Sequence, residues 1–497
     1  MTAWKKAQLR GTGLVALAIV LGIAGCTTVT DNGSSLTDVH PIVASLPKDA
    51  PRVVAPPTAS EREHERLVAS YGGAYRNPAT EHYLDDLVQR LAAQSDRPDI
   101  PYRLTILNAS SVNAFALPSG RLYVTRGLLA LANDDAEIAA VIAHEMAHVS
   151  ARHAIARADL EKQGVLVSAV MTQVLHNPAG QQAVQERSQV NLASFSRQQE
   201  LEADQIGVRT IAKAGFDPYG ASRFLASMSR QLEIRGTTRG PAANANAYDF
   251  LNTHPSTPER IQRAVEVARE FTSAGSSGER DRVSYLSAID GMAYGDDPSQ
   301  GFVRGQTFLH PRLGFTFEAP PNFSIDNTPQ AILGLDGNGR ALRLDTVKLK
   351  DGQSLDTYLS SGWIDGVDTG SVSKITINGN PAVTGLARGD EWSFRLYAIK
   401  FGNDVYRLIL AARDFTPATD AAFQRTAASF RRLTPEELRD IRPMRIDVAT
   451  VRAGDTLQSL AARMSVADDK LEHFLVLNGF DANSAPRPGD RVKLIAE

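Results

Sequence analysis

Residues 133–149 have the sequence N-D-D-A-E-I-A-A-V-I-A-H-E-M-A-H-V, an alanine-rich apolar pattern typical of a helix inside a domain. His144 and His148 are four residues apart, so on a helix both imidazoles project from one face. This geometry suits two adjacent corners of a tetrahedral zinc site. Glu145 lies between them, where a carboxylate can reach a water molecule at the metal. The stretch therefore predicts a zinc centre on a buried helix.

A zinc site that performs chemistry needs a third protein ligand and keeps a fourth position open. Residues 196–204, S-R-Q-Q-E-L-E-A-D, supply the candidates. Glu200 and Asp204 are four residues apart on a predicted helix, so one can bind zinc while the other supports a ligand histidine. Spacing alone leaves the choice among Glu200, Glu202 and Asp204 open.

The pairing of these two motifs resembles the HtpX and CAAX-prenyl-protease type of zinc metallopeptidase, in particular its soluble periplasmic BepA/LoiP-like branch. The resemblance extends to V-N-A-F-A-L-P-S-G at residues 112–120 and N-T-H-P-S at residues 252–256, so it spans residues 61–272. It implies a mainly α, zincin-like metallopeptidase domain with a small β-sheet edge and one Zn²⁺ per chain. An apolar segment at residues 164–175 is too short to span a membrane, which favours the soluble members of the family.

The same resemblance implies a role for individual residues of the site. His144, His148 and Glu200 would be the metal ligands, with Asp204 behind one of the histidines. Glu145 would be the base that takes a proton from the attacking water and delivers it to the leaving amine.

Three further expectations concern the surroundings of the metal. The strand edge formed by Asn113, Ala114, Phe115 and Ala116 would hold an extended peptide substrate by β-augmentation. His254 would be catalytic, either occupying the open metal position in a latent state or stabilising the tetrahedral intermediate. We expect His153 on the surface of the helix that carries His148.

The N-terminus predicts a lipoprotein. A basic start is followed by a short apolar run at residues 13–23, and the ending I-A-G-C resembles a bacterial lipobox. We therefore expect a signal peptide over residues 1–25, lipidation of Cys26 and a flexible tether over residues 26–60. Thr27 is not the aspartate that favours inner-membrane retention in similar lipoproteins. The predicted location is the periplasm, with a lipid anchor in the outer membrane.

Composition and length limit the possible ligands and the number of domains. A formal net charge of −3 gives no indication of nucleic-acid binding, and 497 residues suggest about three domains. After a linker at residues 273–300, residues 301–435 predict an α+β domain of unknown function. Residues 446–496 resemble a LysM module of βααβ order, through V-x-x-G-D-T-L, L-N-G and P-G-D-x-V. That resemblance implies contact with peptidoglycan.

The sequence thus predicts a multidomain zinc endopeptidase that cleaves misfolded or misassembled envelope proteins. One alternative is a wall-binding scaffold or chaperone whose peptidase is latent. Another is an amidase or endopeptidase directed at peptidoglycan.

Overall fold

The computed structural model describes residues 58–155, 195–239 (backbone only for 234–239), 254–272 and 278–497, apart from 330, 362, 363, 365, 467, 468 and 485. The predicted signal peptide, Cys26, the tether as far as residue 57 and the apolar segment 164–175 lie outside these residues. Within the described ranges, no helix has both the length and the apolar character needed to cross a membrane. The chain is multidomain, with a mainly helical region and a separate β-rich region, as the sequence predicts.

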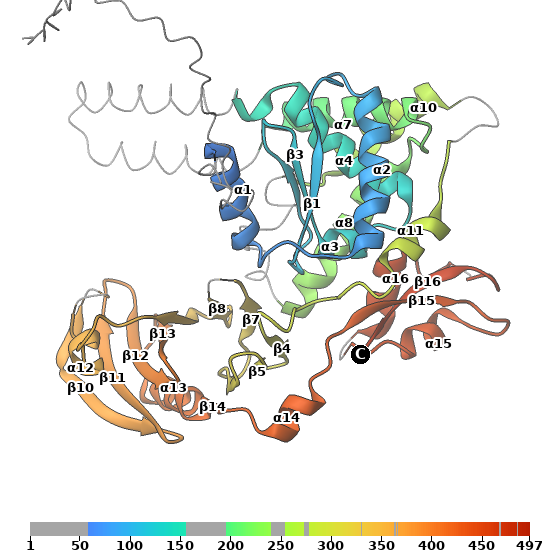
Figure 1. Cartoon of the computed structure of the whole chain (residues 1–497). Helices are drawn as coiled ribbons and strands as arrows, with labels where there is room; N and C mark the ends of the chain where they lie inside the picture. The colour runs from blue at the N-terminus through green and yellow to red at the C-terminus, as the bar shows by residue number, and fades with distance from the viewer. Residues whose placement is uncertain are drawn as a thin grey trace, which may run out of the picture. The chain divides into compact units, whose positions relative to one another are not determined.

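The helical region contains a small sheet at one side (Figure 1). Its helices are α1 (Ala59–Ser70), α2 (Pro78–Gln94), α3 (Arg126–Leu131), α4 (Asp135–Ser150), α7 (Arg197–Lys213), α8 (Gly220–Arg239), α10 (Pro258–Phe271) and α11 (Arg282–Ile289). Its strands are β1 (Arg103–Leu107), β2 (Ala114–Ala116) and β3 (Arg121–Thr125). They lie in the order β1-β3-β2, with β1 parallel and β2 antiparallel to β3. Strand β2 therefore forms one edge of the sheet.

Helix α4 lies at the centre of this region, since every residue from Asp135 to Val149 is buried. Asp134 caps its start by accepting a hydrogen bond from the backbone N–H of Glu137 at 2.9 Å. Helices α2, α7 and α8 and strand β2 all contact α4. Helix α7 can approach closely because Gly207 has no side chain: a Cβ there would lie 3.2 Å from the backbone nitrogen of His144. This approach sets α7 against the part of α4 that carries the histidines.

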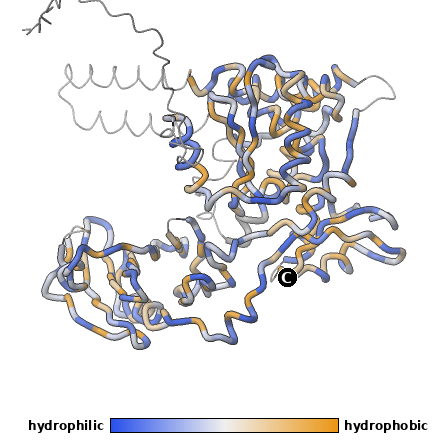
Figure 2. Tube along the Cα trace, in the orientation of Figure 1, coloured by the Kyte–Doolittle hydropathy of each residue, from blue (hydrophilic) through white to orange (hydrophobic). Residues whose placement is uncertain are grey.

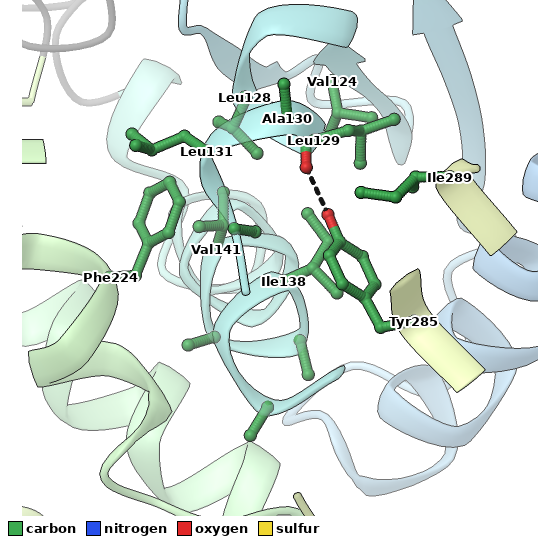
Figure 3. Close-up of a cluster of buried hydrophobic side chains, with 14 of the residues drawn as sticks. Val124, Leu128, Leu129, Ala130, Leu131, Ile138, Val141, Phe224, Tyr285 and Ile289 are labelled. Carbon is green, nitrogen blue, oxygen red and sulfur yellow. Dashed lines mark hydrogen bonds between the residues drawn. The ribbon is translucent and has the colours of Figure 1, made fainter. Parts of the chain in front are cut away.

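The start of α4 is anchored in the hydrophobic core drawn in Figure 3. Ile138 and Val141 of α4 lie among side chains of α3, α8 and α11. Tyr285 of α11 is fully buried, and its hydroxyl donates a hydrogen bond to the carbonyl of Leu129 at 2.6 Å. The helix is thus fixed before it reaches the residues that the sequence singles out.

The β-rich region is built on two sheets. Its strands are β4 (Phe302–Arg304), β5 (Thr307–His310), β6 (Phe315–Glu318), β7 (Ser324–Asn327), β8 (Ile332–Leu335), β9 (Arg340–Val347), β10 (Val367–Ile377), β11 (Asn380–Arg388), β12 (Ser393–Phe401), β13 (Asp404–Ala412) and β14 (Arg431–Arg432). The larger sheet has the order β10-β11-β12-β13-β9-β8-β7, and the smaller has the order β14-β6-β5-β4. Hydrophobic and hydrophilic residues are interspersed along these strands (Figure 2).

Each face of the larger sheet is covered by a helix, which explains its two apolar clusters. Helix α13 (Pro417–Ser429) and the smaller sheet pack on one face, through residues such as Phe423 and Phe315. Helix α12 (Leu355–Leu359) packs on the other face through Tyr358 and Leu359. Helix α14 (Pro435–Asp440) follows in the chain.

The C-terminal unit consists of β15 (Arg445–Thr450), α15 (Leu457–Ala462), α16 (Lys470–Asn478) and β16 (Arg491–Ala496). Strands β15 and β16 pair antiparallel. Side chains of this unit, including Phe474 and Ile495, belong to the same hydrophobic cluster as Ile138 of α4. The unit therefore shares its core with the helical region.

Candidate metal centre

Helix α4 brings His144 and His148 together on one buried face. Their Nε2 atoms are 3.0 Å apart, and the side chains are only 6% and 4% exposed. Glu145 follows His144 and is also buried, and burial raises the pKa of its carboxyl group. The helix thus presents two imidazole nitrogens and one adjacent carboxyl group to the same interior space.

Helix α7 supplies an acidic side chain from the opposite wall, and the structure distinguishes the three carboxylates that spacing left open. Glu200 is turned toward the histidines, with one oxygen 3.4 Å from His144 Nε2 and the other 3.7 Å from His148 Nε2. Asp204 lies behind His144, with Oδ1 3.0 Å from Nδ1. Glu202 is half-exposed and faces His153 Nε2 at 3.5 Å instead of His144 or His148.

His254 joins this group from a segment more than a hundred residues away in the chain. Its Nδ1 atom is 2.9 Å from Glu200 Oε1 and 3.3 Å from His144 Nε2, and its Nε2 atom is 3.8 Å from Glu145 Oε1. It stands just before α10, whose start is capped by Thr257. Four potential ligand residues therefore converge: His144, His148, Glu200 and His254.

The arrangement fits a tetrahedral metal ion. One ligand atom from each of these four residues lies within 4.8 Å of the others. Ligand atoms about 2.0–2.1 Å from a tetrahedral zinc ion would be roughly 3.3 Å from one another, close to the spacings above. Two imidazole Nε2 atoms at 3.0 Å also repel unless a proton or a cation lies between them. Two histidines and a carboxylate are a donor set that zinc accepts.

The electrostatics follow from these contacts. Burial opposes the charge of Glu200, yet hydrogen bonds with His144 and His254 hold the pKa of its carboxyl group well below the usual value. Burial also opposes the charge of His144, but Asp204 and Glu200 raise its pKa to about 9. His148 lies farther from Glu200, at 3.7 Å, and burial lowers its pKa. The carboxylates therefore favour a positive charge at this point.

Arg260 is a buried member of the site that sequence reasoning missed. Its guanidinium donates to both Asp204 oxygens at 2.7 and 2.8 Å and lies 2.9 Å from Glu200 Oε2. It also donates to the carbonyl of Pro255 at 3.0 Å, so it ties the segment after His254 to α7. The only sequence signal was indirect: two buried carboxylates require a cation nearby.

The expectation that His153 lies on the helix surface is wrong. Its ring is only 4% exposed, and its Nδ1 atom is 2.9 Å from Nδ1 of His148. On a continuing helix His153 would be turned about 140° away from His148. Helix α4 instead ends at Ser150, and Arg152 adopts a left-handed conformation with φ of 57°. This turn redirects the chain and brings the His153 ring into contact with His148.

A cavity of about 790 Å³ lies beside the cluster. It is lined by residues of α1, β2 and α4, and by Phe195 and His254. Backbone bonds from Asn113 and Leu117 run to β3, and the alternation of an antiparallel ladder turns the backbone groups of Ala114 and Ala116 away from β3. Among the described strands, β3 is the only partner of β2, so these groups lie at the open edge.

The side chains of the predicted substrate edge have different surroundings. Asn113 is buried and donates from Nδ2 to the hydroxyl of Tyr71 at 3.0 Å. Ala114 is fully buried, whereas Phe115 stacks on Tyr123 with ring centroids 4.7 Å apart. Phe115 and Ala116 line the cavity. An approaching peptide would therefore meet the backbone edge together with the Phe115 ring.

The matches to known protein sequences indicate one kind of protein, a peptidase. Residues 78–268 match Peptidase family M48. The chain is 29% identical over 231 residues to the beta-barrel assembly-enhancing protease of Yersinia pestis, covering 44% of this chain and 45% of that one. It is 30% identical over 202 residues to the mitochondrial metalloendopeptidase OMA1 of Schizosaccharomyces pombe, covering 41% of this chain and 55% of that one. The chain thus spans about half the length of these relatives. The matched residues include the four clustered side chains and Arg260.

Proposed function

Because residues 78–268 form a peptidase family M48 domain, we propose that the chain is a zinc-dependent endopeptidase that cleaves proteins in an extended conformation. The convergence of His144, His148 and Glu200 beside Glu145 is the observation that supports this most directly. His144 and His148 share one helical spacing, but Glu200 comes from a different helix, so local spacing alone does not account for the cluster. A chance surface pair of histidines would not be buried against a carboxylate.

In this proposal His144, His148 and Glu200 hold one zinc ion per chain. When bound, zinc would polarise the scissile carbonyl and lower the pKa of a water molecule toward neutrality. Asp204 Oδ1 lies 3.0 Å from Nδ1 of His144, and a proton held on Nδ1 by this carboxylate would leave the Nε2 lone pair directed into the site. Arg260 offsets the charge of the two carboxylates, Glu200 and Asp204.

Glu145 is proposed as the general base. Within the described residues its Oε1 atom is buried and has no hydrogen-bond partner, so it is available to a water molecule in the cavity. The raised pKa of this carboxyl group suits a base that must also release the proton. Glu145 takes the proton from the attacking water and passes it to the leaving amine.

His254 is proposed to guard the site in a latent state. Its Nδ1 atom occupies the fourth corner of the cluster, in contact with Glu200 and His144. When the segment moves, the same imidazole could stabilise the tetrahedral intermediate of the substrate. The latent peptidase within a scaffold or chaperone remains the second candidate function, because this contact favours a closed resting state.

The substrate and the location are part of the same proposal. The open edge at Ala114 and Ala116 could pair with an extended peptide, with Asn113 and Phe115 shaping the cavity. We propose misfolded or misassembled envelope proteins as substrates, because the Yersinia pestis relative is named a beta-barrel assembly-enhancing protease. The lipobox-like sequence supports anchoring through Cys26 to the periplasmic side of the outer membrane. The LysM-like C-terminal unit supports a contact with peptidoglycan.

The test compares cleavage of unfolded casein and of purified sacculi by the full chain. Glu145→Gln should still bind one zinc ion but lose casein cleavage by at least about a hundredfold. Glu266→Gln, a change at a half-exposed position of α10, should match the wild type. Digestion of sacculi without casein cleavage would instead support an amidase or endopeptidase directed at peptidoglycan. Stoichiometric zinc without any cleavage, even in His254→Ala, would support the scaffold.

A further inference from the structure

Each of the two proposed histidine ligands has a second nitrogen that must be satisfied. An imidazole that offers its Nε2 lone pair to a metal carries its proton on Nδ1 and needs an acceptor there. For His144 the acceptor is Asp204, 3.0 Å away. For His148 the atom facing Nδ1 is Nδ1 of His153 at 2.9 Å.

We propose that His153 is a positioning residue that fixes the tautomer and orientation of His148, with Glu202 as its own partner. The inference rests on the proposed function, because it takes His148 as a metal ligand. His153 Nδ1 can accept the His148 proton only when its own proton is on Nε2. The Nε2 atom faces Glu202 Oε2 at 3.5 Å, and a carboxylate there favours that tautomer.

The opposite tautomer would defeat the site. If His153 carried its proton on Nδ1, it would donate to Nδ1 of His148. The proton of a neutral His148 would then lie on Nε2, pointing at His144 Nε2 3.0 Å away, and the lone pair would be lost to a metal. His153 and Glu202 thus determine which nitrogen of His148 can bind.

The ring of His148 is also held from its face. Phe195 stacks on it with ring centroids 3.9 Å apart and an interplanar angle of 23°. Phe195 restricts the tilt of the ring, and His153 restricts its rotation in the plane. Both constraints direct Nε2 toward Glu200.

The chain adopts an unfavourable conformation to make this contact. Arg152 has a Cβ atom and yet a φ of 57°, a region that glycine usually occupies at the end of a helix. Such a conformation persists where the surrounding structure requires it. Here it places His153 against His148 instead of in solvent.

The two carboxylates that support the histidines, Asp204 and Glu202, should differ in strength because they differ in burial. Asp204 is 6% exposed and contacts His144 directly, whereas Glu202 is 52% exposed and acts through His153. Solvent weakens an exposed charge pair. Loss of the hydrogen-bond acceptor at His153 should therefore matter more than loss of the Glu202 charge.

The test measures the zinc dissociation constant of the full chain by competition with a chromophoric chelator. His153→Asn keeps an acceptor oxygen near the position of Nδ1, whereas His153→Leu keeps the volume without an acceptor. We expect His153→Leu to bind zinc about 10–100-fold more weakly than the wild type, and His153→Asn to recover most of that loss. Glu202→Gln should weaken binding by less than His153→Leu does.

Controls separate positioning from folding. The same Asn and Leu substitutions at His310, a buried histidine of β5 in the β-rich region, should leave zinc affinity unchanged. Thermal unfolding of the metal-free proteins should not distinguish His153→Asn from His153→Leu. Equal zinc affinity of wild type, His153→Asn and His153→Leu would overturn the inference. A wild-type chain that binds no zinc would instead overturn the proposed function.

Discussion

Replacing Lys493 by methionine should destabilise the helical region, although the residue is in the C-terminal unit. Lys493 is fully buried, and its ammonium donates to the carbonyls of Ala130 and Ala132, each at 2.6 Å. These carbonyls end helix α3, immediately before the Asp134 cap of α4. Burial, and then the nearby Arg282, lower the pKa of Lys493 well below its usual value. Desolvation of the ammonium therefore offsets part of what its hydrogen bonds contribute to stability.

The size of the effect can be worked from these contacts. Leaving two buried carbonyls without a donor costs about 1–3 kcal/mol each, or roughly 2–6 kcal/mol together. Removing the desolvation penalty of the buried amine offsets part of this cost. We expect Lys493→Met to lower the free energy of unfolding by about 2–4 kcal/mol. For a unit of this size that corresponds to a fall in Tm of roughly 5–15 °C.

Differential scanning calorimetry of the full chain provides the assay. Since the C-terminal unit shares its core with α4, both should unfold in one transition, and Lys493→Met should shift that transition. Lys374→Met, an exposed change on β10, is the matched control and should leave it in place. The reasoning is refuted if the C-terminal unit melts separately and the transition of the helical region is unchanged by Lys493→Met.

Four further changes test other parts of the structure. His254→Ala should raise the initial rate of casein cleavage several-fold, because the group in the fourth corner is removed, and a slower rate would favour stabilisation of the intermediate over the latent state. Arg260→Met should destabilise the metal-free protein by about 3–5 kcal/mol in thermal unfolding, because two buried carboxylates lose their cation; a Tm equal to that of the wild type would contradict this. Ala116→Pro should raise KM for casein with little change in kcat, since a donor at the open strand edge is lost, and an unchanged KM would argue against β-augmentation there. Burial lowers the pKa of His310 to about 4, so the unfolded state takes up a proton as pH falls below about 6.5 and stability is lost between those values. Urea unfolding of the β-rich region at pH 7 and pH 4 should show a drop of about 3 kcal/mol in the wild type that His310→Leu lacks.

The sequence could predict those parts of the site that depend on local spacing. The interval between His144 and His148 determines that both rings share one face of α4, and the apolar residues around them indicate burial. Spacing could not choose between Glu200 and Glu202, because the orientation of α7 is decided by where it packs. Gly207 permits that packing, and nothing in a single sequence marks it as a contact with α4.

Two outcomes depended on features that periodicity does not contain. His153 was expected on the surface because the helix was assumed to continue past its true end. The left-handed turn occurs at Arg152, where no glycine in the sequence indicates it. The C-terminal unit has the strand-helix-helix-strand order that its motifs predict, but its attachment rests on Lys493. A lysine in a strand is usually solvent-exposed, so its burial could come only from tertiary structure.

The charges around α4 favour a cation at this site. Three buried carboxylates, from Glu145, Glu200 and Asp204, face a single guanidinium, that of Arg260. With all three ionised and the histidines neutral, these side chains carry two net negative charges, an unfavourable state in a low-dielectric interior, and a proton on His144 would offset only one of them. A divalent cation held by the histidines and Glu200 would neutralise that charge and leave Glu145 ionised as a base. The side chains that would bind the metal and the side chain that would use it are therefore parts of one charge balance.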